Sequence, residues 1–512
     1  MQSTMTSIGR EAATADFTLG DFIEKAARLW GDRAALVHRN STVTFEGFRD
    51  RVLRLQTVLE SSGVGQDSRI ALLSDNSPAY FELFFACAGI GATLVPLNIR
   101  LSWREVAYQV DNADISHCVL NRAFAELAER SGLTNLAHWW LDGSYEEAIA
   151  STEPMRGRRF FPPQTAVSQM YTSGTTGFAK GCIHTQGGWR MSMMNLSLGM
   201  RIDRKAVALV QAPLFHAWGL GYSLSHLYMG STLVFPNSNS PADYWEAIDN
   251  FDVTSASVPP TPPPTPEPRP NVTILTSQAG GLRRSARTLR DEYFPNAEIY
   301  GVYGMTELTN IAIMSRAWEE VENPGTMGEP FAGVQFEVHD PEGNPVGRGD
   351  IGQLVIRTSQ ACAGYYKDPE ATADLFKGGW LHTGDLVLVD ERGDIHFQDR
   401  AKDMIKTGGE NVYSAEVERV LLDHPGVADA AVFGVPDERW GEAVKAVVIF
   451  RSQDVTIEQL DAFCLEHIAA YKRPRWYEVA ETLPRNGTGK VVKTKLRELH
   501  DPRTSIRLGE RS

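Results

Sequence analysis

Residues 171 to 181 read "YTSGTTGFAKG" and place three glycines, a group of hydroxyls and one lysine in a single short run. Glycines let the backbone approach an anion closely and turn its amide groups toward it, while hydroxyls and an ammonium complete the shell. The composition of this run predicts a loop that binds the phosphates of a nucleotide. The alternative is a glycine-rich surface turn.

The run does not match the phosphate loop of nucleotide triphosphatases, which ends in Gly-Lys-Ser/Thr. Here Phe178 and Ala179 separate Gly177 from Lys180. The sequence therefore gives no support for that fold, and the remaining motifs have to decide which nucleotide chemistry the run serves.

Four further stretches combine glycine with residues that can carry chemistry. They are "GVYGMTE" (301 to 307), "LHTGDL" (381 to 386), "DRAKDMIKTGGENVYSAEVE" (399 to 418) and "PRNGTGKVVK" (484 to 493). Each could be an ordinary loop when taken alone. Their order and spacing along the chain are more informative than any one of them.

The elements around these motifs are predicted from hydrophobic patterns. "SRIALLSDN" (68 to 76) reads as a strand and turn, "PAYFELFFACAGIG" (78 to 91) as a helix and "ATLVPLN" (92 to 98) as a strand. Such alternation predicts parallel α/β layers. Eight prolines between Pro259 and Pro270 then exclude a continuous helix and predict an extended connector, with an exposed linker as the simplest interpretation.

The chain changes character near Asp399, where a short charged and glycine-bearing segment precedes a compact α/β pattern. In that pattern "AAVFGV" (430 to 435) and "AVKAVVIF" (443 to 450) read as strands around the turn "PDERWGE", and residues 456 to 471 as an amphipathic helix. We therefore predict two domains, residues 1 to 398 and residues 399 to 512, of which the second is small and mobile.

Composition excludes several classes of protein. The 512 residues carry a formal charge of -14, which argues against a general nucleic-acid binder. Five dispersed cysteines with no Cys-x-x-Cys pair indicate neither a disulfide framework nor a structural zinc site, and a reducing cytoplasm is expected. The apolar stretch from Tyr80 contains Glu82 and glycines, so we expect a buried helix and strand there rather than a membrane span.

Together, in this order and spacing, the five stretches resemble the acyl-adenylate-forming superfamily, which includes acyl-CoA synthetases, aryl-CoA ligases, luciferases and adenylation domains of peptide synthetases. The resemblance runs from about Leu19 to Lys495. It implies an α/β multidomain fold with a large N-terminal adenylate-forming domain of packed α/β subdomains and a small mobile C-terminal α+β domain. It also implies ATP, Mg²⁺ and coenzyme A as cofactors.

The resemblance assigns the nucleotide site residue by residue. Tyr303 is expected along the adenine, Thr306 on a phosphate and Glu307 on Mg²⁺, a hard cation that prefers oxygen ligands. Asp385 would accept hydrogen bonds from the ribose hydroxyls with Arg400 beside it, although a buried Asp-Arg pair without a ligand is the competing interpretation. The residues implied on the ATP phosphates are Thr172, Ser173, Gly174, Thr175, Thr176, Gly177 and Lys180.

Two further motifs resemble the parts that act in the two steps of the family's reaction. Lys490, in "NGTGK", resembles the adenylation lysine, whose ammonium would bridge the substrate carboxylate and the α-phosphate. Lys402 corresponds to the hinge about which the small domain turns. In the second orientation Lys406 would lie near the phosphate, and the CoA channel would be formed by Gly408, Gly409 and Asn411.

His216, in "PLFHAWG", resembles the family's gate at the acyl pocket, although a lone histidine near aromatic residues is often a core residue. Trp218 and the mostly apolar segment to Phe235 indicate a hydrophobic pocket. The other residues implied at this pocket are Gln278, Ala279, Gly280, Gly281, Gly304 and Met305.

The sequence departs from the family pattern on its adenylation half. Ala179 stands where the family has proline, "QAGG" from Gln278 stands where it commonly has Gly-Gly-Ala-Pro, and the proline run replaces a helix that would wall the acyl pocket. The CoA half is intact. An enzyme with weakened adenylation, which mainly converts a preformed acyl-adenylate to the thioester, is therefore an alternative.

The sequence thus predicts an AMP-forming acyl-CoA ligase that activates a hydrophobic monocarboxylic acid. The partners implied are the acid or its acyl-adenylate and CoA, with no nucleic acid; a homo-oligomer and a partner enzyme that supplies the adenylate stay open. An adenylation enzyme that loads a carrier protein also fits the motifs. A non-catalytic binder of nucleotide or acyl groups fits them less well, because it would not need both Lys490 and "KTGGENV".

Overall fold

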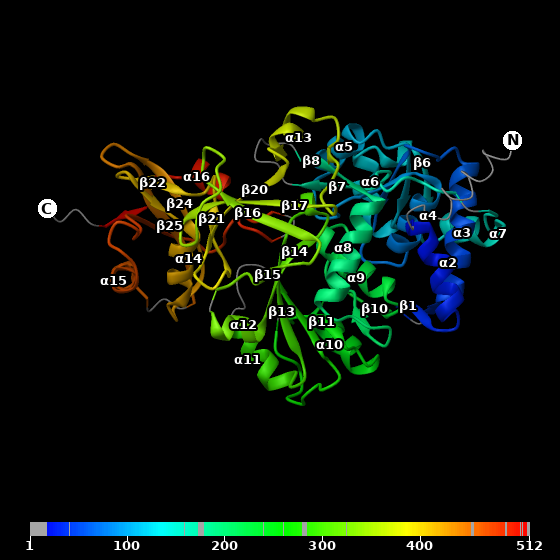
Figure 1. Cartoon of the computed structure of the whole chain (residues 1–512), viewed down its shortest axis with the longest axis horizontal. Coiled ribbons are helices and arrows are strands. Elements are labelled where there is room, and N and C mark those ends of the chain that lie inside the picture. The colour runs from blue at the N-terminus through cyan, green and yellow to red at the C-terminus, as the bar shows by residue number, and fades with distance from the viewer. Residues whose placement is uncertain are drawn as a thin grey trace. The chain divides into compact units, whose positions relative to one another are not determined.

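The computed structural model describes residues 18–39, 41–157, 159–172, 179–238, 240–259, 261–278, 284–323, 325–451, 455–486, 489–501, 503 and 505–508. The chain divides into two compact units, residues 1–336 with 356–381, and residues 337–355 with 382–512. Figure 1 shows the elements of both units and labels many of them.

A nine-stranded sheet of the first unit has the order β15-β14-β13-β12-β11-β9-β10-β1-β2. The strands from β9 to β13, with β1, run parallel, and β2, β14 and β15 are antiparallel to their neighbours. The bounds are β1 Ala34–His38, β2 Ser41–Thr44, β9 Val207–Leu209, β10 Thr232–Phe235, β11 Ser255–Ser257, β12 Ile274–Gln278, β13 Glu298–Gly304, β14 Ile311–Arg316 and β15 Glu329–Pro330.

A seven-stranded sheet of the same unit has the order β18-β8-β7-β4-β3-β5-β6. Strands β7, β4, β3, β5 and β6 are parallel, and β8 turns back antiparallel to β7. The bounds are β3 Arg69–Leu73, β4 Thr93–Pro96, β5 His117–Leu120, β6 Ala137–Trp140, β7 Ala166–Thr172, β8 Lys180–Thr185 and β18 Gly364–Tyr365.

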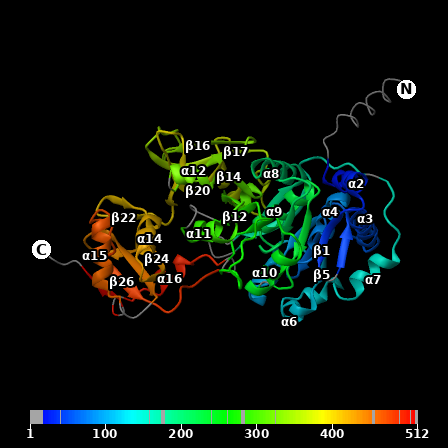
Figure 2. The ribbon, with the colours of Figure 1, turned by 90° about the horizontal axis from the view of Figure 1, so that it is seen from below.

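Helices connect and cover these two sheets, as Figure 2 shows from a second direction. Several begin with a sequence signal that explains their start; for example, Ser102 and Glu105 form a capping box at α5. The bounds are α2 Leu19–Trp30, α3 Phe45–Ser61, α4 Ala79–Ile90, α5 Trp103–Asn112, α6 Ala125–Arg130, α7 Ser144–Ser151, α8 Gln186–Gly199, α9 Ala217–Tyr228, α10 Pro241–Asn250, α11 Arg284–Tyr293, α12 Ala317–Glu322 and α13 Pro369–Leu375. Short 3₁₀ turns are η1 Arg122–Phe124, η2 Leu133–Asn135 and η3 Thr306–Leu308.

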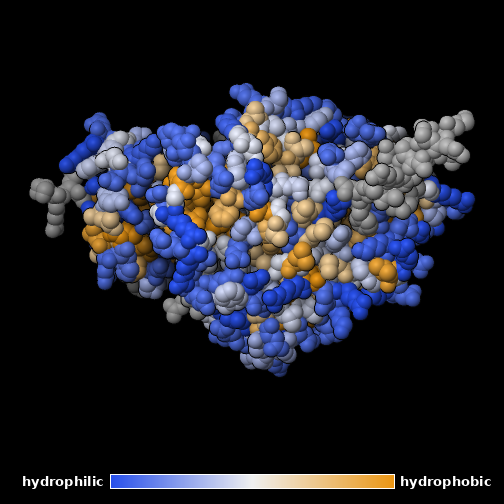
Figure 3. Space-filling view, in the orientation of Figure 1, coloured by the Kyte–Doolittle hydropathy of each residue, from blue (hydrophilic) through white to orange (hydrophobic). Residues whose placement is uncertain are grey.

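The predicted strand, helix and strand at residues 68 to 98 are confirmed as β3, α4 and β4. Every residue of α4 except Gly89 is buried, and apart from Glu82 the helix is apolar on all sides because it lies inside the unit. No helix within the described part of the chain is long and apolar enough to cross a membrane. On the face shown in Figure 3, hydrophobic residues form small groups among hydrophilic ones.

The predicted proline connector runs between β11 and β12 and contains no helix in its described residues. It is not simply an exposed linker, because Arg269 is buried and forms an ion pair with Asp249, with Nε and Oδ1 2.8 Å apart. The guanidinium also lies over the ring of Trp245, 4.8 Å from its centroid. These contacts fix the connector to α10.

The division into units cuts through strands of a five-stranded sheet, with bounds β16 Val334–His339, β17 Ile351–Thr358, β19 Phe376–Lys377, β20 Trp380–Val389 and β21 Ile395–Arg400. The second unit also has a six-stranded sheet with the order β23-β22-β25-β26-β27 and β24 beside β25. Its strands are β22 Ile405–Thr407, β23 Glu410–Val412, β24 Val427–Asp437, β25 Gly441–Phe450, β26 Trp476–Val479 and β27 Ile506–Arg507, and its helices are α14 Ser414–Asp423, α15 Ile457–His467 and α16 Lys493–Glu498.

Alternation along β24 and β25 buries both faces of this sheet. Val432, Val444 and Val448 pack with residues of α14 and α15, whereas Phe433 and Val447 pack on the opposite face with Leu496 of α16. Successive strand residues point to opposite faces, so the alternating pattern builds two small cores. The predicted strands at 430 to 435 and 443 to 450 and the helix after Thr456 are confirmed.

Candidate active site

The predicted phosphate loop joins β7 to β8, where Thr172 and Lys180 are register partners at its two ends. The antiparallel strands therefore fix both ends of the loop next to each other. Its residues Ser173, Gly174, Thr175, Thr176 and Gly177 lie outside the described residues.

Lys180 and Glu307, predicted for phosphate and metal, are brought together by a residue that sequence reasoning missed. The Lys180 ammonium lies over the ring of Tyr365, 5.2 Å from its centroid. The Tyr365 hydroxyl donates a hydrogen bond to Oε1 of Glu307 at 2.7 Å. Burial and the Glu307 carboxylate raise the pKa of Tyr365, so the phenol stays a neutral donor. Tyr365 reaches this place because β18 pairs with β8.

A second chain of hydrogen bonds holds the 3₁₀ turn that carries Glu307. Trp189 Nε1 donates to Ser168 Oγ at 2.8 Å, and Ser168 Oγ lies 3.2 Å from Nδ1 of His184. Nε2 of His184 lies 2.8 Å from the carbonyl oxygen of Thr306. Because a carbonyl only accepts, Nε2 carries the proton and Nδ1 accepts from Ser168. Burial lowers the pKa of His184 to about 4, in agreement with a neutral ring.

The strand β13 delivers Tyr303 and Gly304 to the same turn, followed by Met305 and Thr306. Tyr303 is partly exposed, as expected for a residue that could lie along a base. Gly304 is required by close packing, because a Cβ there would lie 2.1 Å from the Asn310 carbonyl oxygen. The sequence motif contains this glycine but gives no signal for the backbone contact.

Part of the predicted acyl pocket is described. Gln278 ends β12 and pairs with Val302, one residue before Tyr303, whereas Ala279, Gly280 and Gly281 lie outside the described residues. His216 is the N-cap of α9, and its ring makes a T-shaped, edge-on contact with the ring of Phe215. Trp218 is partly exposed on the first turn of α9, and its Nε1 is buried without an acceptor among the described residues.

In the second unit, Asp385 and Arg400 form the predicted pair. They are register partners on β20 and β21, with Arg400 Nε 2.5 Å from Asp385 Oδ1. Asp385 is buried, whereas the Arg400 side chain is 38% exposed. Gly384, with φ 72°, makes the turn in the strand before Asp385. Whether the pair holds a ribose stays a prediction.

The predicted CoA residues lie on one hairpin. Lys406 on β22 and Asn411 on β23 are exposed register partners, and Gly408 and Gly409 form the two-residue turn between the strands. Both glycines have positive φ, 61° and 87°, as a tight hairpin turn requires. The glycines thus have a structural reason independent of any ligand, and the predicted CoA channel stays a prediction.

The predicted hinge Lys402 is exposed in the turn that follows β21. Lys490 is exposed at the end of another turn, where its amide donates to Oδ1 of Asn486 and its carbonyl accepts from the Asn486 amide, both at 2.9 Å. The residues predicted in the second unit therefore occupy three separate places, namely β20–β21 with the hinge, the β22–β23 hairpin and the Lys490 turn.

Comparison with known proteins agrees with this arrangement. The family model described as AMP-binding enzyme matches residues 23–366, and the model of the AMP-binding enzyme C-terminal domain matches residues 416–490. The chain therefore belongs to the family of AMP-binding enzymes. The prediction of the acyl-adenylate-forming superfamily, in its acyl-CoA synthetase branch, and the predicted fold class of a large N-terminal and a small C-terminal domain are confirmed.

Similar proteins are acid-thiol ligases by name. The chain is 34% identical to a feruloyl-CoA synthase of Amycolatopsis sp, covering 94% of this chain and 98% of that protein. It is 32% identical to the fatty acid–[acyl-carrier-protein] ligase ScoC of Streptomyces coeruleorubidus, covering 91% and 93%. Among solved structures it resembles o-succinylbenzoate CoA synthetase from Bacillus subtilis in complex with its acyl-adenylate intermediate, with a TM-score of 0.84, 26% identity and coverage of 94% and 98%.

Proposed function

We propose that this enzyme is an ATP-dependent acyl-CoA ligase, which activates a carboxylic acid as its acyl-adenylate and then transfers the acyl group to the thiol of coenzyme A. The observation that carries the proposal is the cluster of Lys180, Tyr365 and Glu307 at the base of the phosphate loop. In this cluster Tyr365 contacts both an ammonium suited to phosphate oxygens and a buried carboxylate suited to a divalent cation, which supports the proposal.

The chemistry of Glu307 fits Mg²⁺. The side chain is buried, forms no ion pair among the described residues, and keeps Oε2 without a hydrogen bond there. No group of three or more His, Cys, Asp or Glu side chains suited to a metal occurs within the described ranges. A single carboxylate with phosphate and water oxygens is a shell that Mg²⁺ commonly takes. When bound, the cation would neutralise phosphate charge.

The remaining residues act on the two substrates. In the first step a carboxylate oxygen attacks the α-phosphorus and pyrophosphate leaves; Lys180 holds the phosphates and the ammonium of Lys490 stabilises the charge that develops at the α-phosphate. Asp385 and Arg400 hold the ribose. In the second step the thiol sulfur bonds to the acyl carbon, the thiol loses its proton and AMP leaves, with Lys406 near the phosphate and Lys402 as the hinge between the steps.

We further infer that the acid is mostly apolar but carries one hydrogen-bonding group. Asn310 packs against Gly221 of α9, the helix that begins at His216, where a Cβ would lie 2.0 Å from Asn310 Nδ2. Asn310 is 2% exposed, and neither atom of its side-chain amide finds a partner among the described residues. Buried polar atoms are seldom left unsatisfied, so a polar group of the acid is the expected partner of this amide.

Two competing functions have to be separated from this proposal. The departures at Ala179 and Gln278 motivate an enzyme that mainly uses a preformed adenylate. The likeness to a fatty acid–[acyl-carrier-protein] ligase motivates transfer to a carrier protein instead of CoA.

The test measures the two half-reactions separately. Exchange of pyrophosphate into ATP is followed with Mg²⁺ and a panel of acids, and thioester formation is followed from the matching synthetic acyl-adenylates with CoA or with phosphopantetheinylated carrier proteins. Exchange and CoA thioester for one acid support the proposal. Thioester without exchange for any acid supports the adenylate-dependent enzyme, and transfer to carrier protein alone supports the carrier-loading enzyme. Absence of both half-reactions for every acid would remove the proposal.

A further inference from the structure

The seven-stranded sheet contains a second place where this fold type commonly binds ligands. Strands β3, β4, β5 and β6 follow one another along the chain, but their order in the sheet is β4-β3-β5-β6. The chain therefore places β4 on one side of β3 and then β5 and β6 on the other side of β3. The reversal leaves a crevice between the carboxyl ends of β3 and β5. In open parallel sheets, ligands bind at such a switch point.

Polar residues that follow β3 and β5 are joined across this reversal. Asn121 donates from its backbone amide to the Leu73 carbonyl, and its Nδ2 donates to Oδ1 of Asp75 at 2.8 Å. Ser74 Oγ lies 3.2 Å from the same carboxylate oxygen. The Asp75 carboxylate is therefore held in one position by neutral donors, and no cationic side chain of the described residues pairs with it.

A cavity of about 570 Å³ opens at this place, within the usual size range for small-molecule sites. Its lining includes the buried Ser77, which precedes α4, and the buried Glu82, in the first turn of α4. The β1–β2 hairpin supplies His38, Arg39 and the apolar Leu36 and Val43. The cavity thus combines an apolar wall with fixed polar groups, as ligand pockets do.

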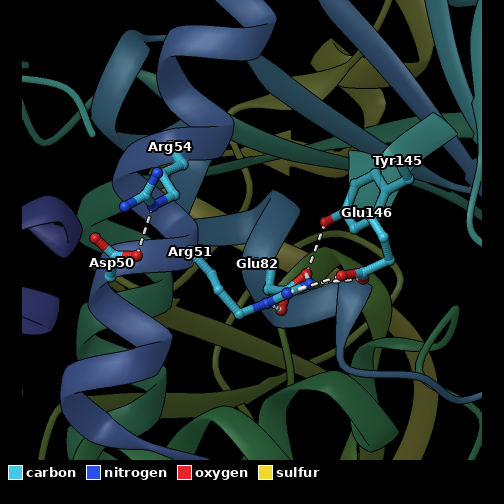
Figure 4. Close-up of polar contacts among 6 residues, drawn as sticks. All are labelled: Asp50, Arg51, Arg54, Glu82, Tyr145 and Glu146. Atoms are coloured by element: carbon cyan, nitrogen blue, oxygen red, sulfur yellow. Dashed lines mark hydrogen bonds and ion pairs between the residues drawn. The ribbon is translucent and has the colours of Figure 1, made fainter. Parts of the chain in front are cut away.

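Part of the lining is an ion network in which one guanidinium, Arg51, is shared by two carboxylates, so the network keeps one net negative charge (Figure 4). Arg51 Nε donates to Oε1 of Glu82 at 2.6 Å, and its two terminal nitrogens donate to the two oxygens of Glu146 at 2.9 and 2.7 Å. Tyr145 donates its hydroxyl to Oε2 of Glu82 at 2.8 Å. Although burial opposes the charged form, the ion pairs with Glu146 and Glu82 raise the pKa of Arg51 above its ordinary value.

The charged groups outside this network define the charges expected on the ligand. Arg122 is paired with Asp142, which also lines the cavity. Asp75 and Arg39 also line the cavity, and neither has an ion pair among the described residues. Burial and the charge of Arg39 lower the pKa of His38, which therefore adds no positive charge at neutral pH. A carboxylate and a guanidinium are thus available to opposite charges on a ligand.

We propose that this cavity is a second small-molecule site, which binds a zwitterion of the amino-acid or dipeptide class with its ammonium on Asp75 and its carboxylate on Arg39. The apolar wall of Leu36 and Val43 receives the side chain of the ligand. All lining residues belong to the first unit, and none belongs to the predicted sites for ATP, acid or CoA.

The test is calorimetric titration of the full-length protein with four probes. L-phenylalanine and L-leucyl-L-phenylalanine carry both charges, N-acetyl-L-phenylalanine lacks the ammonium, and 2-phenylethylamine lacks the carboxylate. We expect at least one zwitterion to bind, and both single-charge analogues of phenylalanine to bind about tenfold or more weakly than that zwitterion, because each analogue lacks one charged hydrogen bond. The two zwitterions distinguish a free amino acid from a peptide as the ligand.

Variants test whether the measured heat comes from binding at this cavity. Asp75→Asn should weaken the affinity for the zwitterion about tenfold and leave the affinity for N-acetyl-L-phenylalanine, which lacks the ammonium, unchanged. Arg39→Gln should weaken the affinity for the zwitterion by a similar factor and leave the affinity for 2-phenylethylamine, which lacks the carboxylate, unchanged. Asp50→Asn is the matched control, since Asp50 pairs with Arg54 one turn from Arg51 and lies outside the lining. If Asp75→Asn fails to fold, Ala123→Phe, at an exposed lining position, blocks the cavity instead.

Two results would overturn the proposal. One is the absence of heat from both zwitterions up to about 10 mM, which is weaker than any specific site needs. The other is binding that persists unchanged in Asp75→Asn, Arg39→Gln and Ala123→Phe, which would place the ligand elsewhere, for instance in the acyl pocket. Neither result bears on the ligase proposal, because the half-reactions are measured without these probes.

Discussion

At the scale of single residues, Glu307 depends on neighbours that the sequence motif does not include. Its buried carboxylate is held by the hydroxyl of Tyr365, and the turn that carries it is held by His184 through the Thr306 carbonyl. A metal ligand is oriented by the residues behind it as much as by its own type. These neighbours are therefore where substitutions should separate metal binding from folding.

Tyr365→Phe should raise the Mg²⁺ concentration for half-maximal pyrophosphate exchange by roughly tenfold, since loss of a partner that orients a metal ligand costs about 10–100-fold in metal affinity. The substitution removes only the hydroxyl that donates to Glu307. The measurement is exchange rate against free Mg²⁺ at saturating acid.

Tyr366→Phe is the matched control, because Tyr366 is the adjacent residue and donates its hydroxyl to the exposed Asp114. It should leave the Mg²⁺ dependence unchanged. An equal Mg²⁺ response in both variants would contradict the role given to Tyr365.

Asn310→Leu keeps the size of a buried side chain but removes its amide, so it should change the choice of acid. For acids that differ by one hydroxyl, we expect kcat/KM for the hydroxylated acid to fall about tenfold or more relative to the other, because a hydrogen bond made in the pocket is lost. Asn296→Leu, at an exposed asparagine outside the site, is the control. Equal loss for both acids would mean that Asn310 has only a packing role.

At the scale of elements, β13 must end in glycine because its last residue touches backbone. Gly304→Ala would place Cβ 2.1 Å from the Asn310 carbonyl oxygen and 2.7 Å from the Ile311 Cα. Backbone on both sides cannot easily move, so we expect destabilisation of about 1–3 kcal/mol or more, and a lower Tm in calorimetry.

Gly301→Ala, three residues earlier on the same strand, is the control. A Cβ there would meet only the Ser315 hydroxyl, at 2.4 Å, which can rotate away. Its Tm should stay closer to that of the unchanged protein. A reversed order of the two Tm values would show that the clash at Gly304 is relieved.

The elements were easier to predict from the sequence than the contacts between them. Alternation in β24 and β25 and the apolar run of α4 predicted their elements correctly, because hydrophobic periodicity is local. The family resemblance assigned Lys180 and Glu307 to one nucleotide site, and in the structure Tyr365 contacts both residues. Tyr365 and His184 were missed because their contacts join strands that are distant in sequence, and a single tyrosine or histidine gives no local signal.

At the scale of the whole molecule, two buried histidines predict loss of stability in mild acid. Burial lowers the pKa of His184 and of His226 to about 4, below the value of about 6.5 expected in the unfolded chain. Between these values the unfolded state binds protons that the folded state does not, so stability falls as pH falls from about 6.5 toward 4. At pH 5 each histidine should cost roughly 2 kcal/mol.

The measurement is urea unfolding of the chain between pH 7 and pH 5. His226→Gln removes one of the two groups and should reduce the slope of stability against pH, because the unfolded chain then binds one proton fewer in this range. The slope should not vanish, because His184 stays and the pKa values of His38 and His500 are also lowered by burial. A slope that is unchanged in the variant would show that other groups control this pH range.

The two-step reaction predicts that backbone freedom at Lys402 matters to one step more than to the other. Proline fixes φ near -65° and restricts the residue before it. Lys402 is exposed in the turn after β21, so Lys402→Pro removes no buried contact.

If the small domain must turn about this residue after adenylation, thioester formation in Lys402→Pro should fall by about 10-fold or more while pyrophosphate exchange stays within a few-fold. Lys402→Ala, which keeps the backbone free, should leave both half-reactions nearly unchanged. Two results would argue against a hinge at this position. One is an equal loss of both half-reactions in the proline variant, and the other is a loss of thioester formation in the alanine variant as large as that in the proline variant.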